Sequence, residues 1–273
     1  MIKADEAGFR RLMEKITRDS GFRCASYKDK CLRRRIAVRM RAKGADTAHE
    51  YAGVLDTDPR EYERLLRSLT VNVTKFFRNP ETYAALEKKV IPELWSATTG
   101  GLRVWSAGCA SGEEPYSVAI LFDKHAQETE SREQLSRLDI LGTDIDDEVL
   151  GEAERAFYAE SALVETPLRF RDHYFPQVAG LRTMVPEVRQ LVRFANDDLL
   201  AFKPPVSDVH LLLCRNVIIY FERDAQDKLF AEFHRVLAPG GFLVLGKVET
   251  LLGDARSLFE PVNARERIFR KQS

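Results

Sequence analysis

The chain has 273 residues, 44% of them hydrophobic, which is ordinary for a globular protein with one large domain or with a smaller companion domain. Its 42 Lys and Arg balance its 42 Asp and Glu. A net charge of zero argues against a general binder of polyanions, although an even total can hide local asymmetry.

Cysteine and histidine spacing argues against a metal centre. The 4 cysteines contain no C-x-x-C pair, and the 5 histidines are scattered without ligand spacing. Neither a zinc site nor a disulfide framework is indicated, and a reducing cytoplasm fits best. No apolar run approaches about 18 residues, and residues 1–16 form a charged amphipathic helix rather than a signal peptide. We therefore expect a cytoplasmic protein without metal or membrane insertion.

Residues 1–95 have helical periodicity throughout and predict an N-terminal helical domain. Residues 28–43 carry eight Lys or Arg against one acid, Asp29, a net charge of +7. One interpretation is a solvated helix face that pairs with acids elsewhere. The other is a docking surface for an acidic partner, either a protein helix or a nucleic acid. A third helical segment is expected over residues 51–69.

The segment NVTKFFRNPETY alternates polar and apolar side chains. Asn72, Thr74 and Arg78 are interleaved with two phenylalanines, and Asn79-Pro80 then begins a helix. One interpretation packs this segment beside a ligand site with Arg78 presented inward. The alternative is an arginine whose head reaches solvent beside two core phenylalanines. The small, polar stretch that starts at residue 96 is the expected domain boundary.

The stretch RVWSAGCASGEEPYS, residues 103–117, predicts a buried strand, a small-residue loop and a helix. Gly108 and Gly112 do not have the dinucleotide spacing, and Glu113 and Glu114 would repel a diphosphate, which disfavours an NAD oxidoreductase. The two acids suit a ligand with a positive charge or ribose hydroxyls, and S-adenosylmethionine has a sulfonium, an ammonium and a ribose. The alternative is that the acids only favour the helix N-terminus.

Strands and helices then alternate to the end of the chain. Asp144 follows the second strand, where such folds place an acceptor for ribose hydroxyls, and Asp146 suits a helix cap. A β-rich insertion is expected at about residues 158–194. The later core elements are expected as a strand over 209–214, a helix over 224–237 and strands over 242–246 and 267–270.

Several stretches together resemble one family, the chemotaxis receptor protein-glutamate O-methyltransferases of the CheR type. They are LRRRIAVRM, NVTKFFRNPETY, VWSAGCASGEEPYSVAI, GTDIDDEVLGEA, LLLCRNVIIYF and LAPGGFLVLG, and they span nearly the whole chain in order. The resemblance implies a class I S-adenosylmethionine-dependent methyltransferase sheet, Rossmann-like and α/β, over residues 96–273, after a helical domain over residues 1–95. It also implies methyl transfer to receptor glutamates, with S-adenosylhomocysteine as the second product.

The resemblance assigns roles to individual positions. Arg78 and Tyr220 would be catalytic, with Tyr220 near the transferring methyl group. The family often has Asn-Leu where this chain has Asp198-Leu199. It often has Gly-His-Ser-Glu where this chain has residues 246–249, so no role is carried over to that turn. The residues expected to contact the cofactor are Asn72, Thr74, Arg78, Gly108, Glu113, Glu114, Asp144, Asp198, Leu199, Asn216 and Val217.

The expected partner is the cytoplasmic helical domain of methyl-accepting chemoreceptors. Its acidic helices would dock on Arg33, Arg34, Arg35, Arg39 and Arg41. Some family members capture a receptor tail peptide with a β-insertion, but the region PQVAGLRTMVPEVRQ has a single glycine and a short loop. We therefore expect no such tether, and we expect a monomer.

Two alternatives to this function stay open. A nucleic-acid methyltransferase on the same fold would use the basic helix to hold phosphates. Base-methylating relatives usually have an Asn- or Asp-Pro-Pro-aromatic motif after the fourth strand, where this chain has CRNV, so no nucleic-acid partner is expected. The other alternative is a non-catalytic module that binds S-adenosylmethionine or a receptor.

Overall fold

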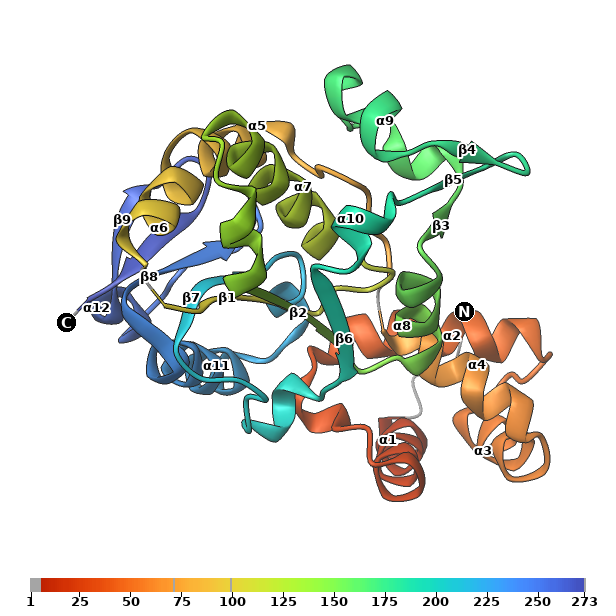
Figure 1. The fold of residues 1–273 in the computed structure, drawn as a ribbon. Coiled ribbons are helices and arrows are strands. Elements are labelled where there is room, and N and C mark those ends of the chain that lie inside the picture. Colours follow the sequence, from red (N-terminus) through yellow and green to blue (C-terminus); the bar gives the residue numbers. More distant parts are fainter. Residues whose placement is uncertain (1–5, 71, 99, 273) are drawn as a thin grey trace. The chain divides into compact units, whose positions relative to one another are not determined.

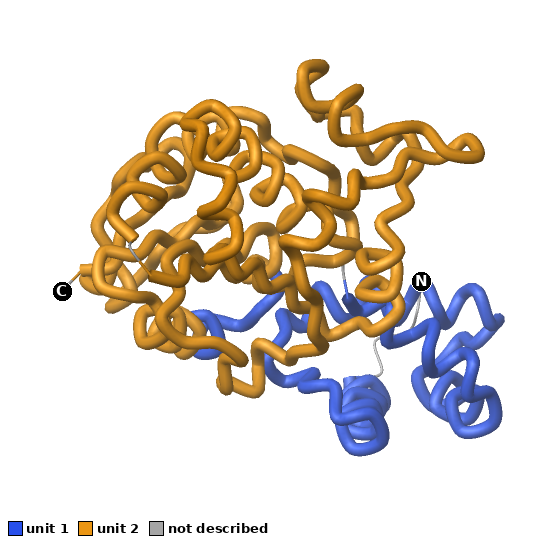
Figure 2. The backbone as a smooth tube through the Cα atoms, viewed as in Figure 1, with its two compact units in different colours: residues 1–71, 220–226 blue, residues 72–219, 227–273 orange. Residues whose placement is uncertain are grey.

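The chain folds into two compact units. The computed structural model describes residues 6–70, 72–98 and 100–272, so the first five residues of the expected N-terminal helix lie outside the described residues. Unit 1 contains residues 1–71 and 220–226, and unit 2 contains residues 72–219 and 227–273 (Figure 2). No helix among the described residues is both long and apolar enough to cross a membrane.

Unit 1 is built from helices that share one apolar core (Figure 1). Leu12 and Ile16 of the first helix meet Leu32 and Ile36 of the second in this core, because each pair lies on one face at helical spacing. The helices are α1 (Glu6–Ser20), the 3₁₀ turn η1 (Cys24–Ser26), α2 (Asp29–Ala42), α3 (Ala48–Thr57) and α4 (Pro59–Leu69).

The single helix expected over residues 51–69 is instead two helices. Asp58 accepts a hydrogen bond from the backbone N–H of Glu61, and Pro59 occupies the first turn of α4. A proline cannot continue α3, but it fits a helix start, where its missing N–H needs no partner.

A buried ion pair joins α2 to α4. Glu61 is fully buried and accepts two hydrogen bonds from Arg39, of 2.9 and 2.6 Å, and one of 2.8 Å from the Tyr51 hydroxyl. Burial alone would raise the pKa of Glu61, but the bonds from Arg39 and Tyr51 outweigh it and lower the pKa. This network fixes the rotation of the basic helix α2 on its neighbours.

A segment from the second half of the chain completes unit 1. The backbone N–H of Lys28 donates to the carbonyl of Tyr220 at 2.8 Å, and the N–H of Glu222 donates to the carbonyl of Ser26 at 2.8 Å. Tyr27 and Phe221, between these bonds, form an antiparallel bridge and an edge-to-face ring contact. Sequence periodicity did not predict this pairing, because it joins residues far apart in the chain.

Unit 2 is organised around a mostly parallel sheet with strand order β6-β2-β1-β7-β8-β10-β9. The first five of these strands pair in parallel, whereas β10 runs antiparallel to both β8 and β9. The strands are β1 (Leu102–Ala107), β2 (Leu138–Asp144), β6 (Val192–Asn196), β7 (Val209–Cys214), β8 (Leu237–Leu245), β9 (Phe259–Asn263) and β10 (Ile268–Lys271).

Helices cover both faces of this sheet (Figure 1). Trp105 of β1 contacts Phe233 of α11, whereas Val104 points to the other face and shares a core with Val118 of α7. Alternate residues of a strand face opposite sides, so these central strands read as continuous apolar runs. The helices and turns of unit 2 are α5 (Pro80–Ala85), the π-helix η2 (Leu86–Val90), α6 (Ile91–Ala97), α7 (Glu113–Glu128), η3 (Arg132–Arg137), α8 (Asp147–Arg155), η4 (Glu160–Leu163), α9 (Leu168–Tyr174), α10 (Pro186–Arg189), η5 (Leu199–Ala201), η6 (Ile218–Tyr220, whose last residue belongs to unit 1), α11 (Arg223–Val236, in unit 2 from Asp227) and α12 (Ala255–Leu258).

The compact units divide at residue 71 rather than at the expected boundary after residue 95. Phe76, Phe77, Tyr83 and Trp95 are buried in the same core as β1 and α7. The helices between residues 80 and 97 therefore belong to unit 2, because their apolar side chains cover its sheet.

The β-insertion is smaller than expected. Its antiparallel sheet has the order β3-β5-β4, formed by β3 (Phe157–Tyr158), β5 (Leu181–Thr183) and β4 (Gln177–Val178). Residues 192–194, which the sequence predicts to lie in the insertion, belong to β6 and pair in parallel with β2. The apolar pattern was correct for a strand, but it could not say which sheet the strand joins. β9 was not predicted.

We predict that Glu61→Gln destabilises unit 1 by about 3 kcal/mol, the low end for a buried ion pair that loses one partner. Because the folded-state pKa of Glu61 is lowered, its contribution is present above the ordinary glutamate pKa of about 4.3 and is lost as the pH falls below it. Hydrogen exchange of the α2 and α4 amides measures the loss, and exposed Glu63→Gln is the matched control. Equal exchange rates in the two variants would contradict a structural role for the ion pair between Arg39 and Glu61.

Candidate functional site

The strand order of the sheet reverses between β1 and β7, and ligands of doubly wound sheets bind at the carboxyl ends of the strands at such a point. Gly108, directly after β1, has φ +80°, and a Cβ there would lie 2.6 Å from a methyl group of Val217, which follows β7. Only glycine allows the two loops to approach so closely. The structure thus brings Gly108 and Val217 together, as the proposed site requires.

Backbone amides tie the loop after β1 to the end of β2. The N–H groups of Gly108 and Cys109 both donate to the carbonyl of Thr143, at 2.8 and 2.9 Å. The N–H of Ala110 donates to the Asp144 carboxylate at 2.9 Å, and Ala110 has φ +47°. These bonds support a backbone conformation that L-residues rarely adopt.

Asp144 is buried at the tip of β2. Its second oxygen accepts a bond from the N–H of Asp146 at 3.1 Å. Burial raises the pKa of Asp144, and the N–H bonds of Ala110 and Asp146 oppose that rise. Asp146 caps α8, as expected, and accepts a 2.9 Å bond from the Asn72 amide. Asn72 therefore lies at the end of β2.

Glu114 and Glu113 have different surroundings, although they are adjacent at the start of α7. Glu114 accepts bonds from the Ser106 hydroxyl at 2.9 Å and from Arg215 at 3.3 Å. Glu113 accepts a bond from Ser111 at 2.8 Å, and burial raises its pKa to about 7. Of the two, Glu114 is the one that contacts residues at the ends of both β1 and β7.

The loop that carries Arg78 is closed by its own hydrogen bonds. The Arg78 guanidinium donates to the carbonyl of Val73 at 2.9 Å in an exposed part of the loop, and the Arg78 residue as a whole is half-buried. Thr74 is half-buried in the same loop. The N–H of Phe77 donates to Ser117 at 3.0 Å, which anchors the loop on α7.

The turn after β7 is held by the carboxylate of Glu249, for which the sequence predicts no role. Glu249 is buried and accepts bonds from the N–H groups of Asn216 at 2.9 Å, Gly246 at 2.6 Å and Ile219 at 3.3 Å. Asn216 has φ +63°, and its side-chain oxygen is buried without a hydrogen-bond partner in the described chain. Buried acceptors are normally satisfied, so this oxygen is available to a ligand donor.

Asp198 and Leu199 lie just beyond the end of β6. Asp198 accepts a bond from the N–H of Leu200 at 2.9 Å and caps a 3₁₀ turn. The N–H of Asp197 donates to the carbonyl of Asp144 at 3.0 Å, which joins this loop to the tip of β2. Burial and the Asp198 charge raise the pKa of Asp197 to about 6.

Tyr220 and the five arginines expected to dock a receptor, Arg33, Arg34, Arg35, Arg39 and Arg41, belong to unit 1. The Arg35 guanidinium lies 5.4 Å from the centre of the Tyr220 ring and donates to the carbonyl of Ser68 at 2.6 Å. Arg33 pairs with acids of α1 and α2, and Arg39 binds Glu61. These three arginines therefore serve the internal packing of unit 1.

The exposed part of the basic helix is narrower than its charge suggests. Of the five arginines, Arg34 and Arg41 are exposed and have no ion pair with the described residues. Lys30 and Val38, which is 49% exposed, continue the same helix face. We call the residues Lys30, Arg34, Val38 and Arg41 the α2 stripe.

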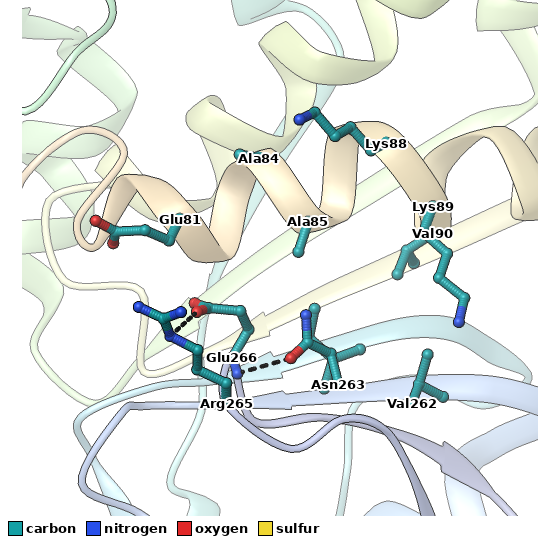
Figure 3. Close-up of a pocket in the computed structure, with 11 residues that line it drawn as sticks. Glu81, Ala84, Ala85, Lys88, Lys89, Val90, Val262, Asn263, Arg265 and Glu266 are labelled. Atoms are coloured by element: carbon teal, nitrogen blue, oxygen red, sulfur yellow. Dashed lines mark hydrogen bonds and ion pairs between the residues drawn. The ribbon is translucent and has the colours of Figure 1, made fainter.

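Unit 2 contains a cavity. It has a volume of about 540 Å³, and Figure 3 shows it between the α5–η2 helix and the β9–β10 hairpin, lined by Ala85, Lys89, Asn263 and Arg265 among others. None of the residues expected to bind a cofactor lines it. Among residues 6–70, 72–98 and 100–272, no group of three or more His, Cys, Asp or Glu is arranged to hold a metal ion.

The residues at the strand ends fit S-adenosylmethionine. The carboxylates of Glu114 and Asp144 would suit an ammonium and ribose hydroxyls, and the Asn216 side-chain oxygen is buried without a partner among the described residues. The sequence predicts these three residues as cofactor ligands, and it predicts no role for Arg215 or Glu249. The signal for Arg215 was a charged residue directly after an apolar strand.

Comparisons with known proteins show which family the chain belongs to. A model described as the S-adenosylmethionine-binding domain of CheR methyltransferases matches residues 72–268, and the CheR all-alpha domain matches residues 7–70. The chain is 33% identical over 240 residues to a chemotaxis protein methyltransferase of Listeria monocytogenes, covering 88% of each chain. It is 34% identical over 261 residues to an uncharacterised 104.1 kDa protein of Rhodobacter capsulatus, covering 95% of this chain and 27% of that one.

With a doubly wound sheet, acceptors at its switch point and these matches, the chain belongs to the CheR family of S-adenosylmethionine-dependent methyltransferases and has their class I fold.

Proposed function

We propose that the protein transfers a methyl group from S-adenosylmethionine to glutamate side chains of chemoreceptors and forms glutamate methyl esters. Family membership supports this proposal, because the Listeria relative is named a chemotaxis protein methyltransferase. The observation that carries it is the group of three acceptors, Glu114, Asp144 and Asn216, at the carboxyl ends of neighbouring strands of unit 2.

A glutamate substrate sets modest chemical demands on the enzyme. Its carboxyl group has an ordinary pKa of about 4.3 and is already ionised at neutral pH, so no general base is required. Bound S-adenosylmethionine supplies the methyl group. The protein's own contribution is then to hold the carboxylate in line and to exclude water, and effective-molarity terms make such positioning worth several kcal/mol.

Arg78 is the proposed positioning group for the substrate carboxylate, and Tyr220 is its proposed companion. The Arg78 guanidinium now donates to the Val73 carbonyl, a neutral acceptor that a carboxylate can replace. A pairing of moderate strength suits this role, because a full salt bridge would reduce the reactivity of the nucleophile.

The α2 stripe is the proposed receptor-docking surface. Its three cations and the exposed Val38 suit an acidic, partly apolar helix. We further propose that no receptor tail peptide is tethered at the β-insertion. β3 and β4, the edge strands of that sheet, have two residues each, and β4 turns into β5 through Ala179 and Gly180, both with positive φ. Such short edges offer few backbone bonds to an added strand.

Incubation with methyl-labelled S-adenosylmethionine and membranes that contain the host's receptors tests the function. We expect label in the receptor band and base-labile release of methanol, as a carboxyl ester requires. Base-stable label in protein or label in nucleic acid would overturn the glutamate assignment. Cofactor binding without transfer would indicate a binding module.

We predict that Asp144→Asn weakens S-adenosylmethionine binding by about 1 to 3 kcal/mol, the usual cost of a buried donor that loses its acceptor. The matched control is Asp139→Asn, which removes a carboxylate from the opposite end of the same strand, where it pairs with Arg193. Calorimetry measures both affinities, and thermal unfolding checks that Asp144→Asn remains folded. Unchanged affinity would remove Asp144 from the site.

We predict that Arg34→Glu with Arg41→Glu strongly reduces receptor methylation at physiological salt and leaves cofactor affinity unchanged. Exposed ion pairs contribute about 0.2 to 1 kcal/mol each, and reversal adds repulsion. The control is Arg60→Glu with Arg64→Glu, two exposed arginines on α4 that give the same change in net charge. Equal methylation by both double variants, or tight binding of a receptor tail peptide, would contradict the docking model.

A further inference from the structure

We propose that Arg215 is a positioning residue that holds the cofactor acid Glu114 and the turn carrying Arg78 in one arrangement. The proposal rests on the proposed function for the role of Arg78, but its first half concerns cofactor binding alone. All residues involved lie in unit 2. Arg215 touches neither the substrate nor the cofactor in this proposal, and it acts through the two groups that do.

The guanidinium of Arg215 is shared between two parts of the site. Its side chain is 2% exposed. One terminal nitrogen donates to Glu114 at 3.3 Å and to the Tyr83 hydroxyl at 3.2 Å. The other donates to the carbonyl of Arg78 at 2.8 Å and to the Asn79 side chain at 3.1 Å. The planar fork of arginine can serve both directions at once, which a lysine ammonium cannot.

The turn that Arg215 binds needs support from outside. Phe77 has φ +54° and Asn79 has φ +62°, left-handed values on both sides of Arg78. Such conformations persist only where surrounding contacts fix them. The N–H of Asn79 is bound by Glu165 at 2.8 Å, and Arg215 binds the carbonyl between the two strained residues. Without Arg215 the Arg78 backbone would lose this contact, and the position from which its side chain extends would no longer be fixed.

The charge of Arg215 also controls the ionisation of Glu114. Burial raises the pKa of Glu114, and Arg215 opposes the rise through its charge and its hydrogen bond. Removing the cation therefore raises this pKa further and favours the neutral carboxyl, which is a poorer acceptor for a cationic ligand. The titratable groups that interact with Glu114 are Arg215, Tyr83, Glu249, Cys109 and Cys214.

Arg215→Met tests the charge. We expect S-adenosylmethionine affinity to fall about tenfold at pH 7, the effect of losing one charge-assisted bond. The difference in affinity from the wild type should narrow as the pH is raised and Glu114 of the variant ionises. In a Glu114→Gln background the same substitution should change affinity little, because its target is gone. A gap that does not vary with pH, or full additivity with Glu114→Gln, would overturn the first half of the proposal.

Arg215→Lys tests the geometry. The ammonium keeps the charge beside Glu114, so cofactor affinity should stay within about threefold of the wild type. It cannot also bind Arg78 and Asn79, so kcat for receptor methylation should fall about tenfold, the effect of one lost charge-assisted bond. Loss of affinity with normal kcat would contradict the second half.

Arg137→Met is the matched control for folding. Like Arg215, Arg137 binds backbone carbonyls, has a buried Nε without a partner and lies 5.2 Å from an aromatic ring centre, but it serves Trp95 and Thr98. It should lower thermal stability without altering the pH dependence of cofactor affinity. If wild-type protein binds the cofactor but methylates no receptor, the proposed function fails, and the pH and Glu114 measurements still decide the role of Arg215.

Discussion

Buried carboxylates that accept backbone N–H groups are the constraint on which the site depends. Asp144 receives the amides of Ala110 and Asp146, and Glu249 receives those of Asn216 and Gly246. These amides lie in loops that leave the sheet, where no ladder can satisfy them, and an unsatisfied buried donor costs about 1 to 3 kcal/mol. The same acids that give the loops their shape therefore supply the negative charge at the strand ends.

Local patterns predicted the central elements well. β1, β2 and β7 are buried on both faces, so their apolar runs stand out from the flanking glycines and charges. Membership of a core was harder to predict. The helices between residues 80 and 97 have an apolar face, but periodicity cannot tell whether that face meets other helices or a sheet. The same ambiguity placed part of β6 in the β-insertion.

The candidate site divides in the same way. Glu114, Asp144 and Asn216 could be predicted because each lies at or soon after the carboxyl end of a strand, where a parallel sheet gathers its ligands. Arg215 and Glu249 act through partners far away in the chain, including the carbonyl of Arg78 and the amide of Asn216. Spacing in the sequence has no signal for such contacts. The sequence did not predict that Glu113 and Glu114 have different hydrogen-bond partners, because the Glu114 partner Arg215 is also far away in the chain.

The net charge of the basic helix α2 overestimates how much positive charge the helix exposes to solvent. Residues 28–43 carry a net charge of +7, yet Arg33, Arg35 and Arg39 donate hydrogen bonds to groups within unit 1. A helix that packs on acids and carbonyls needs cations on its buried flank as well as on its exposed one. The α2 stripe consequently has three cations around Val38. The docking of an acidic helix proposed for it would combine a salt-sensitive part with an apolar part that salt does not screen.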